Sequence, residues 1–512
     1  CVLANRLSAD PAHRVCLIEA GPEDRSPLIH IPAGILGTIP RRQVNWAFKT
    51  EPQPGLGGRQ GYQPRGRVLG GSSSINAMVY MRGHRSDYDD WAALGNPGWG
   101  YEDVLPLFRR SEDQQRGADA FHGSGGELTV SDLASPAAAS HAFVESAARA
   151  GLARNPDFNG ASQDGAGLYQ VTQRRGRRCS AAVAFLQPAL ARPNLTVLTG
   201  RHATRIVFEG ARATGIEVEG PGGTARIDAE RELILSAGAF GSPQLLLLSG
   251  IGPREELSRH GISLRHELPG VGRNLVDHID LALVYRSDDR SLMGITPRTA
   301  LRAVAGYFEW RDRGTGILTT NFAEAGAFFR TRPELERPDV QLHFVNGLAD
   351  DHARRLHYGY GISCHVAVLR PKSRGSVRLA SADPAAAPIV DPNYFSDPAD
   401  VDAYVAGIEF GLAVGNGRGF DDMRQAQISA ATGKRAEMVE HIRANAATYY
   451  HFVGTCAMSR AESAPVDPAL RVRGVERLRV ADASVMPLVT CCNTHAPTLA
   501  LAERAAELIR AG

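Results

Sequence analysis

Lysine is almost absent from this chain. Lys49, Lys372 and Lys434 are its only lysines, and arginine supplies nearly all the remaining positive charge. Acidic residues balance that charge, because 57 Lys and Arg face 55 Asp and Glu, which leaves a formal net charge of +2. A chain without a strong charge of one sign has no general affinity for a polyanion, so we expect no nucleic-acid partner. The arginine-, alanine- and glycine-rich usage is typical of a bacterial gene.

The chain also lacks a pattern of cysteines and a long apolar run. Its seven cysteines are an odd number without regular spacing, and no CxxC pair occurs among them. We therefore expect neither a disulfide framework nor a metal site, and a reducing compartment fits. No run of about 18 apolar residues occurs, so no membrane span is expected. We place the protein in the cytoplasm, with the surface of the inner membrane as the alternative.

Short continuous apolar runs indicate a parallel sheet. Val15–Ile18, Leu195–Leu198, Leu233–Ala237 and Leu478–Ala481 have the composition of strands that are buried on both faces. The first ends in Glu19, where a dinucleotide-binding βαβ unit carries the carboxylate that accepts hydrogen bonds from ribose. Taken alone, Glu19 is more often an ordinary charge at a strand end. Other local patterns predict helices at Cys1–Leu7 and Pro243–Leu248 and a hairpin of Ala203–Val207 with Gly215–Val218.

The pattern changes between about Leu281 and Ala447. Asp339–Phe344, Val366–Leu369 and Ser376–Leu379 alternate or run apolar, which predicts a separate and largely antiparallel sheet. Helices flank it, including Arg435–Ala446. Because no low-complexity linker separates the two patterns, we expect two domains interleaved along the chain.

The most informative stretch is Gly66–Asp89, GRVLGGSSSINAMVYMRGHRSDYD. Gly70 and Gly71 have no Cβ, so their backbone can closely approach a ligand, and the serines that follow add hydroxyl groups. GGSSS alone is more often an ordinary surface loop. The full stretch, however, resembles the first signature of the glucose–methanol–choline (GMC) family of FAD-dependent oxidoreductases. Gly238–Gly252, GAFGSPQLLLLSGIG, resembles the second signature of the same family.

This resemblance implies an α/β fold, in which a Rossmann-like FAD-binding domain is interleaved with an α+β substrate domain built on an antiparallel sheet. We assign residues 1–90, 165–280 and 448–512 to the FAD-binding domain, and residues 91–164 and 281–447 to the substrate-binding domain. The family's GxGxxG turn would lie immediately before Cys1, and we interpret the sequence as truncated there. Ile75 occupies the position where some relatives carry a histidine bonded to flavin, so we expect FAD to bind without a covalent link.

The resemblance also implies which residues contact FAD. The expected contacts are Glu19, Gly70, Gly71, Ser74, Asn76, Ala77, Met78, Ala203, Ala237, Asp482, Ala483, Pro497 and Thr498.

Two histidines resemble the catalytic positions of the family. His451 lies in YYHFVGTCAM, and His495 lies in CCNTHAPT before the C-terminal helix. A single histidine is more often structural, but alcohol oxidation needs a base for the hydroxyl proton and a donor that holds the oxygen. We assign His451 as the base and His495 as its partner.

The substrate pocket is predicted from two further residues. Glu324 aligns with a position that faces the substrate in relatives acting on choline, and Tyr450 could line the same pocket. A carboxylate beside aromatic rings suits a quaternary ammonium group. A structural role for Glu324 in a strand or helix is an equal alternative.

The resemblance therefore implies an FAD-dependent dehydrogenase or oxidase that converts a primary alcohol to an aldehyde by hydride transfer to flavin N5, with oxygen or a quinone-type acceptor. One alternative is choline dehydrogenase or oxidase. Another is a lyase or photodecarboxylase of the same fold. A flavin-binding protein without activity stays open as well, because Phe452 and Ser459 replace a proline and a glycine that are common near the first catalytic histidine.

Overall fold

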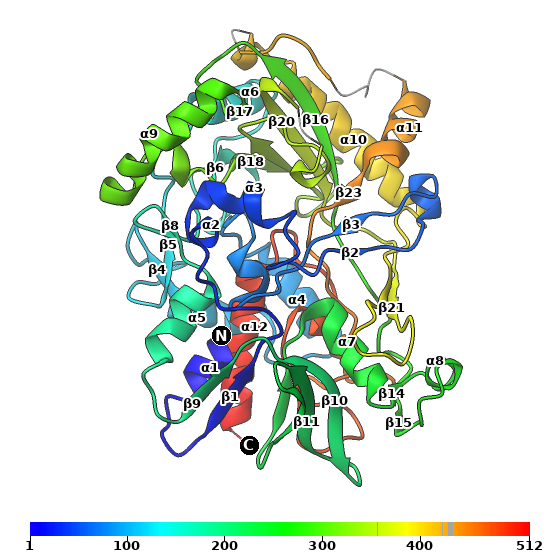
Figure 1. Ribbon diagram of the computed structural model, residues 1–512. Helices are drawn as coiled ribbons and strands as arrows, with labels where there is room; N and C mark the ends of the chain where they lie inside the picture. The colour runs from blue at the N-terminus through cyan, green and yellow to red at the C-terminus, as the bar shows by residue number, and fades with distance from the viewer. Residues whose placement is uncertain (356, 422, 429–433, 512) are drawn as a thin grey trace.

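The computed structural model has two parts, with the loop of residues 66–89 between them (Figure 1). It describes residues 1–355, 357–421, 423–428 and 434–511. The lower part in Figure 1 contains both chain ends, and the upper part contains a large antiparallel sheet. Within the described residues, no helix has the length and apolar character needed to cross a membrane.

Two pairs of parallel strands form the centre of the lower part. β1 (Val15–Ile18) pairs with β9 (Leu195–Leu198), and β13 (Leu233–Leu235) pairs with β24 (Leu478–Val480). These are the four apolar runs that the sequence predicts as parallel strands. The expected burial on both faces is wrong for β1 and β9, in which Cys16 and Thr196 are exposed. α12 (His495–Arg510) packs along α1 (Val2–Leu7), so the two ends of the chain meet in one core.

A three-stranded meander joins this part. β10 (His202–Glu209), β11 (Arg212–Gly220) and β12 (Gly223–Asp228) are consecutive and antiparallel. The predicted hairpin is present, but β12 was not expected, because its exposed sequence GTARID has no apolar face to reveal it.

The helix α7 (Gly238–Leu248) begins directly after β13. It starts earlier than the predicted Pro243, which lies inside the helix. Proline cannot donate to the carbonyl four residues earlier, that of Ala239. The hydroxyl of Thr455 donates to this carbonyl instead, at 2.7 Å, so the helix continues through the proline without an orphaned oxygen.

The upper part is built on an antiparallel sheet. Its strand order is β23 (Ala447–Thr448), β16 (Ile279–Ser287), β20 (Gly359–Val368), β19 (Val340–Val345), β18 (Ala323–Phe329) and β6 (Gly165–Leu168), and β17 (Gly294–Ile295) pairs with β20. The helices α6 (Ala138–Arg149) and α10 (Pro398–Gly415) pack against this sheet.

Two details differ from the expected domain organisation. β6 pairs with β18, so residues 165–168 join the upper sheet and not the FAD-binding part. The predicted strand at Ser376 forms β21 (Ser376–Arg378), which pairs with β22 (Ile389–Asp391) outside the large sheet. We retain the two interleaved domains as a proposal, with β6 moved to the substrate domain.

Short elements complete the chain. The other helices are α2 (Pro27–His30), α3 (Ile35–Thr38), α4 (Arg85–Ala93), α5 (Tyr101–Ser111), α8 (Arg254–Arg259), α9 (Pro297–Arg313) and α11 (Arg435–Asn445), and a π-helical turn covers Ala182–Leu186. The other strands are β2 (Phe48–Lys49), β3 (Tyr62–Gln63), β4 (Glu112–Gln114), β5 (Leu128–Val130), β7 (Gln173–Arg174), β8 (Arg177–Arg178), β14 (Ile251–Gly252) and β15 (His266–Glu267).

Candidate active site

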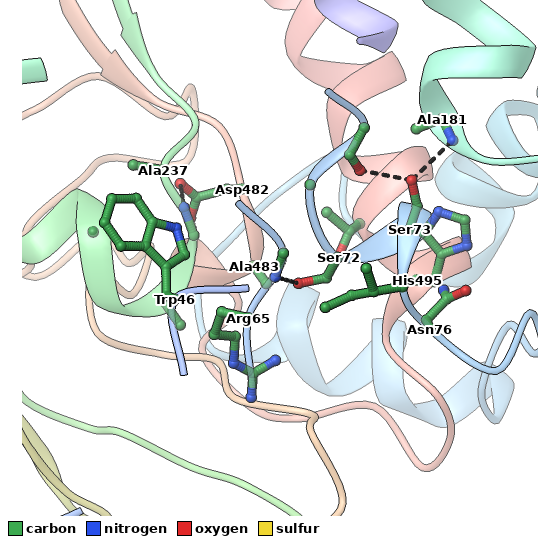
Figure 2. A pocket seen from close by; sticks show the side chains of 18 of the residues that line it. Trp46, Arg65, Ser72, Ser73, Asn76, Ala181, Ala237, Asp482, Ala483 and His495 are labelled. Atoms are coloured by element: carbon green, nitrogen blue, oxygen red, sulfur yellow. Dashed lines mark hydrogen bonds between the residues drawn. The ribbon is translucent and has the colours of Figure 1, made fainter. Parts of the chain in front are cut away.

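A cavity of about 2180 Å³ is lined by residues of both parts. Figure 2 shows Ser72, Ser73, Asn76 and His495 in one group of lining residues, with Trp46, Ala237 and Asp482 in another. Most of the expected cofactor contacts lie on its wall: Glu19, Gly70, Gly71, Asn76, Ala77, Met78, Ala203, Ala237, Asp482, Ala483 and Thr498. Ser74 and Pro497 are buried behind the wall.

The loop of residues 66–89, called the central loop from here on, exposes the backbone of two glycines to this cavity. Gly70 and Gly71 have φ values of 87° and 57°, in the left-handed region that favours glycine. A Cβ added at Gly71 would meet no atom within 4 Å, so the loop leaves room for a ligand here. An added Cβ at Gly70 would instead approach Ser74 Oγ at 2.4 Å.

The loop serines hold the loop together. Ser73 Oγ donates to Gly70 O at 2.6 Å and accepts from Ala181 N at 2.9 Å. Ser74 Oγ donates to Leu69 O at 2.7 Å. These hydroxyl groups were expected to face a cofactor, but the local backbone engages them, because a loop with two left-handed glycines leaves polar groups to satisfy.

Arg178 donates hydrogen bonds to the loop of residues 66–89, and the sequence did not predict it as a site residue. It is 1% exposed and donates to Ser73 O at 3.1 Å and to Asn76 O and Oδ1 at 2.7 and 2.8 Å. Burial lowers the pKa of its guanidinium group to about 9. The run RRGRR at 174–178 indicates a solvated segment, and nothing in it marks its last arginine as buried.

Glu19 lies at the carboxyl end of β1 and lines the cavity. Its Oε1 accepts from Gly21 N at 2.7 Å. Burial raises the pKa of this carboxyl group to about 7, against the opposing effect of the Gly21 hydrogen bond. A half-buried carboxyl group at a strand end can exchange hydrogen bonds with the hydroxyl groups of a ribose.

The first turn of α7 provides a second backbone approach. Asp482 Oδ2 accepts from Gly238 N at 2.9 Å and from Ser242 Oγ at 2.5 Å, which fixes the turn between β13 and α7. Gly238 has a φ of 79°, and a Cβ added there would meet no atom within 4 Å. The Asp482 carboxylate already caps this helix start, and the open space beside Gly238 allows a ligand to approach the backbone closely.

His451 stands at the junction of the two parts and is buried. Its backbone N–H donates to Asp277 Oδ1 at 2.8 Å. Its Nδ1 lies 2.9 Å from Nδ1 of His278, and its Nε2 lies 3.2 Å from Nδ2 of Asn493. Burial, and secondarily His278, His343 and Arg65, lowers the pKa of His451 well below its usual value.

This chain of hydrogen bonds assigns the tautomer of His451. His278 Nε2 lies 3.0 Å from the carbonyl of Leu369, which can only accept, so this nitrogen carries the proton. Burial lowers the pKa of His278 to about 4, so the ring is neutral and its Nδ1 is an acceptor. His451 Nδ1 must then donate, which leaves the lone pair of His451 on Nε2, beside the Asn493 amide.

Asn493 lies within hydrogen-bond distance of His451, which the sequence did not predict. His495 is the first residue of α12 and lies beside Asn76 and Ser73 in Figure 2. Among the described residues, neither of its ring nitrogens has a hydrogen-bond partner. The assignment of His495 as the partner of His451 stays a prediction, and Asn493, from the turn before α12, is a second candidate for this role.

Glu324 does not line the cavity. It lies in β18, is 1% exposed, and accepts from Ala137 N, Ser140 Oγ and Thr320 Oγ1 at 2.8, 2.7 and 2.6 Å. These bonds fill both carboxylate oxygens, so the structure favours the structural alternative for Glu324. Tyr450 does line the cavity, and its hydroxyl group lies 2.6 Å from His352 Nδ1.

Three acidic residues line this end of the cavity, namely Asp280 at the start of β16, Asp350 and Asp351. Asp280 Oδ2 lies 2.7 Å from Nδ1 of His365. Burial alone would lower the pKa of His365, but the Asp280 carboxylate outweighs burial and raises it. Asp280 Oδ1 and His365 Nε2 are both buried and have no hydrogen-bond partner in the described part of the chain.

Comparison with known proteins places this geometry in a family. Two family models described as GMC oxidoreductase match residues 28–280 and 371–502. The alcohol dehydrogenase [acceptor] of Pseudomonas putida is 45% identical over 514 residues, which cover 99% of this chain and 93% of that protein. The mitochondrial choline dehydrogenase of Homo sapiens is 40% identical and covers 100% and 88% of the two chains.

Comparison with solved structures supports the same family assignment. The crystal structure of pyridoxine 4-oxidase from Mesorbium loti superposes with a TM-score of 0.90 at 33% identity, covering 100% of this chain and 97% of the other. Formate oxidase superposes with a TM-score of 0.91 at 28% identity, covering 100% and 96%. The chain therefore belongs to the GMC oxidoreductase family of FAD-dependent enzymes.

Proposed function

We propose that this enzyme oxidises a primary alcohol to the aldehyde and that His451 accepts the hydroxyl proton. The observation that carries the proposal is the lone pair assigned to His451 Nε2, which faces Asn493 Nδ2 at the cavity. A neutral imidazole is the form that can accept a proton, and the depressed pKa of His451 keeps the ring neutral at pH 7.

Asn493 is the second group in this proposal. The Nδ2 group of Asn493 is a hydrogen-bond donor beside His451 Nε2. The oxygen of a substrate alcohol can accept a hydrogen bond from the same group. As the hydroxyl proton moves to Nε2, negative charge grows on that oxygen, and a fixed N–H donor stabilises it. Proton transfer by a positioned base contributes about 10²–10⁴ in rate. Bound FAD supplies the two-electron acceptor for the hydride that leaves the carbinol carbon.

The cavity wall fits FAD. Glu19 would hold a ribose, the open backbone at Gly71 and Gly238 would approach the phosphates and the ring system, and Asp482 would keep the α7 turn in place. Ile75 has no nucleophilic atom, so binding is non-covalent. The further contacts proposed are Gly70, Asn76, Ala77, Met78, Ala203, Ala237, Ala483 and Thr498, with Ser74 and Pro497 as buried supports.

The preferred substrate in this proposal is an uncharged alcohol. Asp280 is compensated by His365, whose raised pKa favours the charged imidazolium, and Glu324 lies outside the cavity. A quaternary ammonium group would meet a paired carboxylate and not a free one. Choline stays as the alternative substrate, because Tyr450 and Asp280 line one cavity.

The electron acceptor in this proposal is oxygen or a quinone-type molecule, and the location is the cytoplasm, with the surface of the inner membrane as the alternative. The experiment that tests the function is anaerobic mixing of the FAD-loaded enzyme with a panel of neutral alcohols and choline. Bleaching of the flavin by a primary alcohol supports the proposal. A flavin that stays oxidised with every alcohol would favour a lyase, a photodecarboxylase or an inactive flavoprotein. Reoxidation by air or by a quinone-like dye then identifies the acceptor class.

A further inference from the structure

The helix α9 turns apolar side chains toward solvent. Its buried residues Thr299, Gly306 and Trp310 share one side, as the helical repeat of ~3.6 residues requires. On the opposite side, Leu301 is 72% exposed and Phe308 is 56% exposed. Val304 and Tyr307 extend this outer face, with exposures of 67% and 43%.

This arrangement is the reverse of an ordinary surface helix, whose apolar stripe faces the core. Figure 1 shows α9 along the outer edge of the upper part. Ile295, just before the helix, is also exposed, at 41%. Scattered apolar residues need no explanation on a protein surface, but a contiguous group on one helix marks an interaction site.

Exposed arginines lie at both ends of α9. Arg298, Arg311 and Arg313 of α9 are exposed, and Arg311 lies over the Phe308 ring at 5.2 Å. The helix also carries Glu309 and Asp312, and Asp312 forms an ion pair with Arg311, so these two charges compensate each other.

The arginine-rich turn between β7 and β8 lies against the C-terminal end of α9. Trp310 Nε1 donates to Gly176 O at 2.7 Å, and the Arg177 guanidinium lies 4.3 Å from the Trp310 ring. Arg175 and Arg177 are exposed in this turn. This turn therefore adds positive charge at the C-terminal end of α9, on the side of Trp310 and not on the outer face.

We propose that the outer face of α9 binds the surface of an anionic phospholipid bilayer. Leucine, valine and phenylalanine side chains would enter the boundary between headgroups and acyl chains, and the arginines would meet lipid phosphates. A second copy of the chain fits less well, because a symmetric contact through this face would bring the same arginines against each other.

The face lies beside an opening of the cavity. Ile295 and Leu36 both line the cavity, and both are exposed, at 41% and 46%. A molecule dissolved in the bilayer could therefore reach the cavity without crossing water. This deepens the proposed function, on which it rests, by favouring a lipid-soluble quinone-type acceptor over oxygen.

The test is co-sedimentation of the FAD-loaded enzyme with vesicles of phosphatidylethanolamine and phosphatidylglycerol. Wild-type protein should sediment with these vesicles, and less with phosphatidylcholine alone or at high salt. The double substitution Leu301→Ser and Phe308→Ser should weaken binding by about tenfold or more. Arg298→Glu with Arg313→Glu should weaken it by roughly fivefold or more for each arginine.

The matched control is Leu94→Ser with Leu190→Ser, which removes two leucines of similar exposure, 48% and 51%, from other elements. This control should bind vesicles like the wild type, and all variants should keep FAD and the wild-type unfolding temperature. The proposal is overturned if the wild type ignores the vesicles, or if the Leu301/Phe308 variant binds them equally. It is also overturned if that variant instead converts a dimer into a monomer without lipid. None of these readouts uses alcohol oxidation, so loss of binding is distinguishable from failure of the proposed reaction.

Discussion

At the scale of single residues, the proposed chemistry depends on where one proton sits. The Leu369 carbonyl holds the proton of His278 on Nε2, and His278 in turn holds the proton of His451 on Nδ1. Each step follows from a backbone oxygen that can only accept. The result is a lone pair on His451 that faces Asn493 and the cavity, without any carboxylate acting directly on the ring.

Replacement of His451 should separate catalysis from cofactor binding. We expect His451→Ala to lower the rate of anaerobic flavin reduction by about 10²–10⁴, because it removes a positioned base. FAD content should stay unchanged, since the proposed cofactor contacts lie on other segments. Asn493→Ala should also lower this rate, whereas His495→Asn, two residues away, should have the milder effect. A dead His495→Asn enzyme beside an active Asn493→Ala enzyme would return the partner role to His495.

The pH dependence of flavin reduction should report the environment of His451. The base form is required, and burial depresses its pKa, so the rate should fall only as the pH drops well below the usual histidine value near 6.5. His278 also lowers this pKa. His278→Phe should therefore move the acid limb of the profile to higher pH and reduce the plateau rate, because Nδ1 of His451 loses its acceptor. Stopped-flow measurement from pH 5 upward, with Tyr360→Phe as a control outside the site, tests this shift. An unmoved acid limb would assign His278 to packing alone.

The site residues that could be predicted from the sequence are those that lie in a recognisable motif. His451, Glu19 and Gly71 fall in recognisable stretches. Asn493 lies in the same motif as His495, but only the start of α12 decides which of them faces His451. Arg178 and His278 act through contacts with segments about 100 residues or more away, and no local pattern reports such contacts.

At the scale of elements, the apolar pattern predicted the parallel strands but not their burial, because Cys16 of β1 and Thr196 of β9 are exposed. β1 and β9 have the expected bounds, because VCLI and LTVL have no alternative period. The apolar pattern did not predict elements that are exposed or that contain an internal proline. β12 has no apolar face, and Pro243 hides the continuity of α7, which depends on a hydroxyl group more than 200 residues away.

The continuity of α7 gives a prediction at this scale. Thr455→Val keeps the shape of the side chain but leaves the buried Ala239 carbonyl without its donor. An unsatisfied buried acceptor costs about 1–3 kcal/mol, so the unfolding temperature should fall. Thr224→Val, at an exposed position of β12, is the matched control and should leave stability nearly unchanged. Equal unfolding temperatures for both variants in thermal denaturation with excess FAD would show that α7 does not need Thr455.

At the scale of the whole molecule, the chain passes between the two parts several times, and the cavity lies where they meet. The change of apolar pattern near residues 281 and 447 predicted this interleaving. It could not predict that β6 joins the upper sheet, because the pairing of Gly165–Leu168 with β18 spans about 160 residues and GAGL has little strand character.

Removal of FAD should therefore loosen the molecule as a whole. Proposed contacts come from the lower part, the central loop and the turns beside His451, so FAD binds the folded arrangement and not the unfolded chain. Binding at ~100 times the dissociation constant stabilises the folded state by about 2.7 kcal/mol. We expect the FAD-free protein to unfold at a lower temperature, with the lower and upper parts separating into two transitions in calorimetry at one fixed scan rate.

Added ADP, which supplies only the ribose and pyrophosphate half of the cofactor, should raise the unfolding temperature of the lower part alone, because Glu19 and Gly238 lie there. A single transition at the same temperature with and without FAD would mean that the two parts are held together by their own contacts and that the cofactor contributes nothing to their union.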